Sequence, residues 1–161
     1  MEKGLYFDLA TAIQLFYTSQ SNQFEECERR LNEYFSYPAS WITIKSMLAI
    51  PEITSKVKLF LFTQLHSKLL FGYHTISKTD DPIHTRKLLI YHLQTSSDAN
   101  LIKYCSKSLA ILAMHTINKW HDCIEELIKS FFVKQKLLIS FLVIGVKLFT
   151  RIWLILPAIR K

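Results

Sequence analysis

The sequence contains few of the residues that make tight turns or cross-link a chain. Three Gly and four Pro among 161 residues are too few for the many turns of an all-β sandwich or barrel. The Cys residues are odd in number and far apart, at Cys27, Cys105 and Cys123. They predict neither a disulfide framework nor a Cys-x-x-Cys metal site, and this usage is typical of a reducing compartment. The first residues carry neither a basic stretch nor a long apolar one, so no secretory signal is expected.

An excess of charge of one sign is also missing from most of the chain. Residues 1–126 hold 13 Lys or Arg and 13 Asp or Glu, and the whole excess of +7 follows Glu126. A nucleic-acid-binding protein needs a basic face on its folded part, because phosphate neutralisation supplies most of the non-specific affinity. Direct binding to nucleic acid is therefore not expected. Half of the residues are hydrophobic and 20% are charged, which excludes a mainly disordered chain.

Apolar residues recur at helical spacing along the chain, and no segment alternates as a strand does. Polar breaks and Pro51 divide the pattern, and Pro38 and Pro82 stand where the first turn of a helix accepts proline. Asp98 ends one polar break and is a predicted cap of the helix after it. The predicted helices cover about residues 5–18, 22–35, 38–50, 54–76, 82–94, 99–116 and 118–131. The apolar residues assigned to the first are Leu9, Ile13, Leu15 and Phe16, and those assigned to the fifth are Leu88, Leu89, Tyr91, His92 and Leu93.

The sequence therefore predicts an all-α protein. Long and short helices alternate in antiparallel pairs of about 36–40 residues, which is close to the period of a HEAT or armadillo-type α-α superhelix. About three and a half pairs are expected, followed by an apolar C-terminal helix. Periodicity alone fits an ordinary helix bundle equally well.

Four segments, in order and at near-constant spacing, carry a family resemblance over about residues 9–131. The first is Ala-Thr-Ala-Ile-Gln-Leu-Phe-Tyr at residues 10–17, and the second is Leu31-x-x-Tyr34-Phe35-Ser36 with Ser40-Trp41 after it. The third is Pro51-Glu52-Ile53, followed by Phe60 and then by Leu65-His66-Ser67-Lys68-Leu69. The fourth is Tyr104-Cys105, followed by Leu109-Ala110-Ile111-Leu112-Ala113 and then by Trp120-x-x-Cys123. Together they resemble the N-terminal domain of the importin-β family of nuclear transport receptors, most of all its importin-13 and transportin-3 branch. Phe62 and Thr63 depart from the pattern, because the family usually has small residues there.

The resemblance implies an α-solenoid that carries protein cargo between cytoplasm and nucleus through the nuclear pore. Its implied partners are the GTP-bound form of the small GTPase Ran, protein cargo and nuclear pore components, and no catalytic chemistry or cofactor is implied. Gln64 and Lys68, on the second helix of the second pair, are the candidate contacts with Ran. Trp41 and Trp120 are predicted to open helices at repeat junctions, where they would be packing anchors.

Other patterns of chemical residues favour ordinary structural roles. His121 with Glu125, and His84 with His92, lack a third ligand at a plausible spacing, so no metal site is expected. Cys105 and Cys123 lie on apolar stripes and are predicted to be core residues. A charged face on the second helix, formed by Glu25, Glu26, Glu28 and Glu33, is predicted to be solvated surface.

Residues 132–161 differ in composition from residues 1–131 and share none of the resemblance. The longest stretch without charge, Leu137–Val146, is far short of the roughly 20 residues that span a bilayer. Extending it brings in Lys147 and Arg151, which make insertion marginal.

Two other interpretations of this tail stay open. The first is an amphipathic helix on a membrane surface or against another repeat, because Lys136, Ser140, Lys147 and Arg151 share one narrow helical stripe. The second, which the abrupt change of composition favours, is a segment outside the family sequence, such as a splice variant or a truncated gene model. Three functions follow: a transport receptor, a small membrane-associated helical protein anchored by its tail, and a short decoy that binds Ran but lacks a cargo surface.

Overall fold

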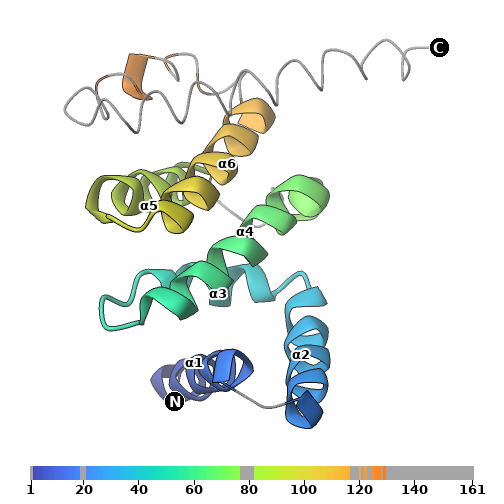
Figure 1. Ribbon diagram of the computed structural model, residues 1–161. Coiled ribbons are helices and arrows are strands. Elements are labelled where there is room, and N and C mark those ends of the chain that lie inside the picture. The colour runs from blue at the N-terminus through green and yellow to red at the C-terminus, as the bar shows by residue number, and fades with distance from the viewer. Residues whose placement is uncertain are drawn as a thin grey trace. The chain divides into compact units, whose positions relative to one another are not determined.

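The computed structural model describes residues 2–18, 21–76, 82–116, 120, 122, 125–127 and 129, and within these residues all regular secondary structure is helical (Figure 1). The helices are α1 (Glu2–Thr18), α2 (Ser21–Ser36), α3 (Ser40–Leu48), α4 (Ser55–Ile76), α5 (Pro82–Thr95) and α6 (Ala99–Thr116). The prediction of an all-α protein is confirmed for this part of the chain. Most of the predicted helix 118–131 and all of the tail 132–161 lie outside the described residues.

The chain divides into two compact units between Asp80 and Asp81. The first holds α1 to α4, in which α1 packs on α2 and α4, and α3 packs on α2 and α4. The second holds α5 and α6, which pack on one another. Within each unit, helices that follow one another in sequence are therefore also neighbours in space. None of the described helices combines the length and apolar character that crossing a bilayer requires.

The core of the first unit forms around α4, whose inner side repeats at helical spacing. Its fully buried residues are Val57, Leu61, Phe62, Leu65 and Leu69. The Phe60 ring lies 5.9 Å from the Phe16 ring of α1 and 5.5 Å from the Phe35 ring of α2. Aromatic pairs at such distances contribute beyond the area that they bury, so this cluster ties three helices together.

A short turn leads from α2 into α3. The Ser40 hydroxyl donates to the Tyr37 carbonyl at 2.7 Å and to the Phe35 carbonyl at 3.2 Å, which fixes the turn from inside. The sequence predicts that this helix begins at Pro38, but α3 begins at Ser40. The Pro38 carbonyl already accepts from the Trp41 amide at 3.2 Å, so Pro38 belongs to the tight turn that precedes the helix.

Helix α5, the first helix of the second unit, begins where the sequence predicts. Helix α5 starts at Pro82, whose fixed φ suits the first helical position. Asp98 caps α6, because its Oδ1 accepts from the amides of Asn100 at 2.8 Å and Leu101 at 3.3 Å. This confirms the predicted cap, and Leu89, Leu93, Leu101, Cys105, Leu109 and Leu112 then form the core between the two helices.

Two of the apolar residues that indicate the first and fifth predicted helices are exposed. Leu15 is 51% exposed and Tyr91 is 57% exposed. Each follows a fully buried residue, Ile13 or Leu89, by two positions. Two positions turn a helix by about 200°, which sends the second side chain to the opposite face.

Candidate functional site

Gln64 and Lys68, the two residues that the resemblance singles out, lie one turn apart on α4 and line the same pocket. Its volume is about 340 Å³, at the lower end of the range for ligand-binding pockets. The pocket lies in the first unit between α2, the α2–α3 turn and α4. We call it the α2–α4 groove, and its lining residues are Asn32, Phe35, Ser36, Pro38, Gln64, Ser67, Lys68, Phe71 and Gly72.

Lys68 is the cation of the groove. Its Nζ donates to the backbone carbonyl of Tyr37 at 3.0 Å, which joins α4 to the α2–α3 turn. Burial lowers the pKa of the Lys68 ammonium below its ordinary value, because desolvation disfavours the charged form. Within the described residues no carboxylate pairs with Lys68. The groove therefore offers a partly desolvated positive charge whose single bond in this part of the chain is to a neutral carbonyl.

Large apolar surface borders the groove. Phe71, one turn beyond Lys68, is 83% exposed, and Tyr37 is 60% exposed. Phe71 follows the fully buried Leu69 by two positions, so the helix directs its side chain away from the core. An aromatic side chain this exposed beside a pocket is typical of a surface that meets a partner.

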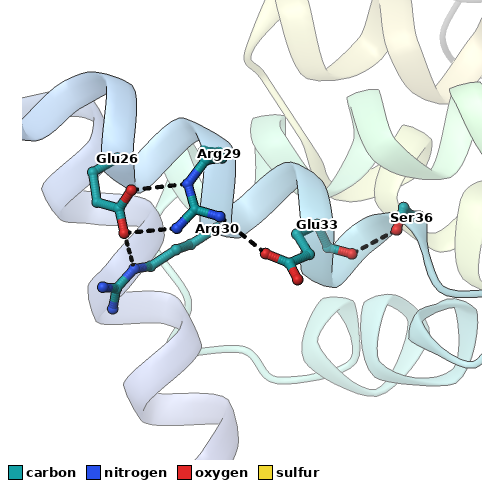
Figure 2. A network of polar contacts seen from close by, with 5 residues as sticks. All are labelled: Glu26, Arg29, Arg30, Glu33 and Ser36. Carbon is teal, nitrogen blue, oxygen red and sulfur yellow. Dashed lines mark hydrogen bonds and ion pairs between the residues drawn. The ribbon is translucent and has the colours of Figure 1, made fainter.

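The acidic residues of α2 do not supply the missing countercharge. Figure 2 shows that Glu26 accepts hydrogen bonds from Arg29 and Arg30, and that Glu33 pairs with Arg29 at 3.3 Å. These bonds lower the pKa of Glu26 to about 2, the Arg29 hydrogen bond being the largest cause. All four predicted acidic residues of this face are exposed, as expected of solvated surface. Two of them are already paired along their own helix.

Trp41 is buried within the first unit and opens α3 as its second residue. Its ring lies 5.7 Å from Lys45 Nζ, a cation–π distance. Its indole Nε1 has no hydrogen-bond partner in the described part of the chain. The side chain therefore acts through packing, as predicted for an anchor.

Trp120 is buried in the second unit, where it joins a polar triad. Its Nε1 donates to Glu126 Oε2 at 2.8 Å, and the Arg86 guanidinium lies 4.5 Å from the centre of its ring. Arg86 Nη1 lies 3.4 Å from the same Glu126 oxygen, while the buried Arg86 Nε has no hydrogen-bond partner among the described residues. Trp120 itself is not helical, and the residues directly before and after it lie outside the described ones. Its predicted roles as a packing anchor and as the opening of a helix therefore stay predictions.

The sequence reasoning missed Arg86 and Glu126. They are 40 positions apart in sequence, and neither stands in a motif. The cue that was available is the combination of a buried Trp and a nearby acid, since an indole N–H buried away from water needs an acceptor.

The remaining candidates for chemistry are separated or buried. His84 is exposed, whereas His92 is buried, so the two do not face one ligand. No group of three potential metal ligands occurs in the residues that the structure describes, and His121 is not among them. Cys105 is buried as predicted for a core residue, and burial raises the pKa of its thiol. Cys123 lies outside the described residues.

Comparisons with protein-family models, with curated proteins and with solved structures found no match.

Proposed function

We propose that this chain is an α-solenoid nuclear transport receptor of the importin-β type, or an N-terminal portion of one. In this proposal it binds Ran in its GTP form together with protein cargo, and it works in the cytoplasm and the nucleus. The α2–α4 groove forms part of the surface that meets Ran. Gln64 and Lys68 make the contacts there.

The observation that carries the proposal is the shared position of Gln64 and Lys68. The family resemblance implies both as Ran contacts, and both line one groove with exposed apolar surface at its border. A surface of this kind suits a macromolecular partner, because exposed aromatic side chains provide the large contact areas on which such interfaces depend.

The order of the helices is a second support. Helices α3 and α4 pack as neighbours in the first unit, and α5 and α6 do so in the second. Successive helix pairs of this kind are the building blocks of a HEAT-type superhelix. We propose that α1 with α2, α3 with α4 and α5 with α6 are three such repeats.

Capture of purified Ran by the full chain tests the proposal. The immobilised chain is incubated with Ran loaded with GTP or with GDP, and bound Ran is quantified. We expect selective capture of the GTP form, and Lys68→Met should weaken that capture by about tenfold, since a charge-assisted bond is lost. Equal capture of both forms, or no capture by a chain that is helical by circular dichroism, contradicts the proposal.

Lys58→Met is the matched control for this experiment. Lys58 lies on the same helix and also donates to a backbone carbonyl, that of Pro51 at 3.2 Å, but it does not line the groove. Capture of Ran should be unchanged in this variant. If Lys68→Met and Lys58→Met lost Ran capture equally, the loss would come from removing a lysine of α4 and not from the groove.

A small membrane-associated helical protein remains the second candidate. It is favoured by the apolar and basic sequence of residues 132–161, which lie outside the described residues. Carbonate extraction separates the two functions, because an anchored protein stays with the membrane pellet and a transport receptor is released.

A further inference from the structure

The α2–α4 groove combines three features that together specify the chemistry of an occupant. It has a cation without a carboxylate partner among the described residues, a polar amide beside that cation, and an exposed aromatic ring at the border. Lys68, Gln64 and Phe71 supply these features from successive turns of one helix. The three side chains therefore share one stretch of α4 of about two turns.

The charge is the first step of the argument. The Lys68 ammonium has three hydrogen-bond donors, and in the described residues only the Tyr37 carbonyl accepts from it. Burial lowers the pKa of this ammonium. An anionic acceptor that enters the groove offsets this desolvation, because an opposite charge within about 4–6 Å favours the charged form.

The identity of the acceptor is the second step. No carboxylate of α2 pairs with Lys68 among the described residues, and Glu26 and Glu33 are engaged by arginines of their own helix. Gln64 adds an amide that donates as well as accepts. A carboxylate with two oxygens fits this pair of donors better than a neutral group does, since charge-assisted hydrogen bonds are shorter and stronger than neutral ones.

The apolar border is the third step. Phe71 is the most exposed of the large hydrophobic residues in the described part of the first unit, and Tyr37 exposes its ring on the α2–α3 turn. An occupant that offered only a carboxylate would leave this surface in water. An aliphatic side chain next to the carboxylate covers this aromatic surface, and the burial of the two apolar surfaces stabilises the complex.

From these observations we propose that the α2–α4 groove binds a protein segment in which an acidic residue adjoins a large aliphatic one. The carboxylate accepts hydrogen bonds from Lys68 Nζ and the Gln64 amide, and the aliphatic side chain covers Phe71. The inference deepens the proposed function and rests on it, since it takes the surface assigned to Ran and names the chemistry that this surface recognises in its partner.

Three fluorescein-labelled peptides of equal length test this inference with the full chain. They repeat Ser-Gly-Glu-Leu, Ser-Gly-Gln-Leu and Ser-Gly-Lys-Leu, so that only the charge at one position differs. Fluorescence polarisation at low salt measures the dissociation constant of each. We expect the Glu peptide to bind about tenfold more tightly than the Gln peptide, and the Lys peptide to bind more weakly than both. Equal affinity for the Glu and Gln peptides overturns the inference.

Two pairs of variants locate the binding. Lys68→Met should abolish the preference for Glu over Gln, whereas Lys58→Met should keep it. Phe71→Ser should lower the affinity for the Glu peptide and for the Gln peptide by a similar factor. Tyr91→Ser, which removes an exposed aromatic ring from the second unit, should leave both affinities unchanged. A preference for Glu that survives Lys68→Met, or that is lost in Lys58→Met, overturns the assignment to the groove.

The outcome for the peptides is separable from the outcome for Ran. A chain that prefers the Glu peptide in a Lys68-dependent way but captures Ran equally in both nucleotide states contradicts the proposed function and supports the chemistry of the groove. Selective capture of Ran-GTP with no peptide preference contradicts the inference and supports the function.

Discussion

Each of the two units contains a cation that is partly withdrawn from water, and the two units treat it differently. In the second unit the Arg86 side chain, 18% exposed, contacts the carboxylate of Glu126 and the ring of Trp120. In the first unit Lys68 lies in an open groove, and its one partner in the described residues is a neutral carbonyl. Arg86 therefore has its countercharge within the fold. Lys68 has no carboxylate partner among the described residues, and its ammonium has further donors.

This difference separates a structural cation from a binding one. A buried charge that is paired and hydrogen-bonded holds elements together, and removal of its partner is costly. A partly desolvated charge without such a pair contributes little to stability and gains most from an external anion. The predictions below test this contrast, from the largest expected effect to the smallest.

Glu126→Gln should destabilise the second unit. The change removes the countercharge of Arg86 and weakens the bond from Trp120 Nε1, while the size of the side chain is kept. Because Glu126 is only partly shielded from water, we expect a loss of about 1–2 kcal/mol in the free energy of unfolding. Urea denaturation followed by circular dichroism measures it.

Glu125→Gln is the matched control for that measurement. Glu125 pairs with Lys129 at 2.7 Å, but both side chains are mostly exposed. Such a surface pair contributes about 0.3–0.5 kcal/mol. Equal losses in the two variants would contradict the structural role of the Arg86, Trp120 and Glu126 triad.

Lys68→Met should change the pH dependence of stability. Since burial lowers the pKa of Lys68 in the folded chain, the unfolded chain binds more protons at pH values just below the ordinary pKa of 10.5. Stability therefore rises as the pH increases through that window. In Lys68→Met the free energy of unfolding should rise less over this pH range, whereas Lys58→Met should keep the rise that Lys68 causes. Urea denaturation between about pH 8 and pH 10.5 checks the slope, and a steeper rise in Lys68→Met would contradict the account.

Glu26 should titrate well below the ordinary glutamate pKa of 4.5. Its pKa of about 2 arises from the Arg29 and Arg30 hydrogen bonds, so the stability that these bonds contribute is present above the ordinary pKa of 4.5. That contribution is lost as the pH falls toward 2. Carboxyl NMR titration should show this lowered pKa of Glu26, and Arg29→Gln should move it toward 4.5. An unchanged pKa in that variant would contradict the hydrogen-bond cause.

The sequence was most informative where the cause of a structure is local. Pro82 starts α5 and Asp98 caps α6 as predicted, because each acts on backbone groups within one turn. The helical period also indicated helices α1 to α6 close to their observed bounds. It did not separate buried from exposed apolar residues, because Leu15 and Tyr91 are exposed although each follows a buried residue by two positions.

Contacts between distant residues were beyond local reasoning. The resemblance selected Gln64 and Lys68, but no pattern indicated that Asn32 and Ser36 of α2 would face them across a groove. The pairing of Arg86 with Glu126 likewise depends on how the chain returns to α5 after α6. Such contacts are fixed by tertiary packing, which neither propensity nor charge spacing encodes.

The most direct test of the contrast measures two quantities on two variants. The dissociation constant for Ran-GTP and the free energy of unfolding are determined for Lys68→Met and Glu126→Gln in the full chain. The account predicts that Lys68→Met weakens binding by about tenfold with stability at neutral pH nearly unchanged, and that Glu126→Gln lowers stability with binding nearly unchanged. Loss of stability without loss of binding in Lys68→Met would contradict the central claim that Lys68 is a binding cation.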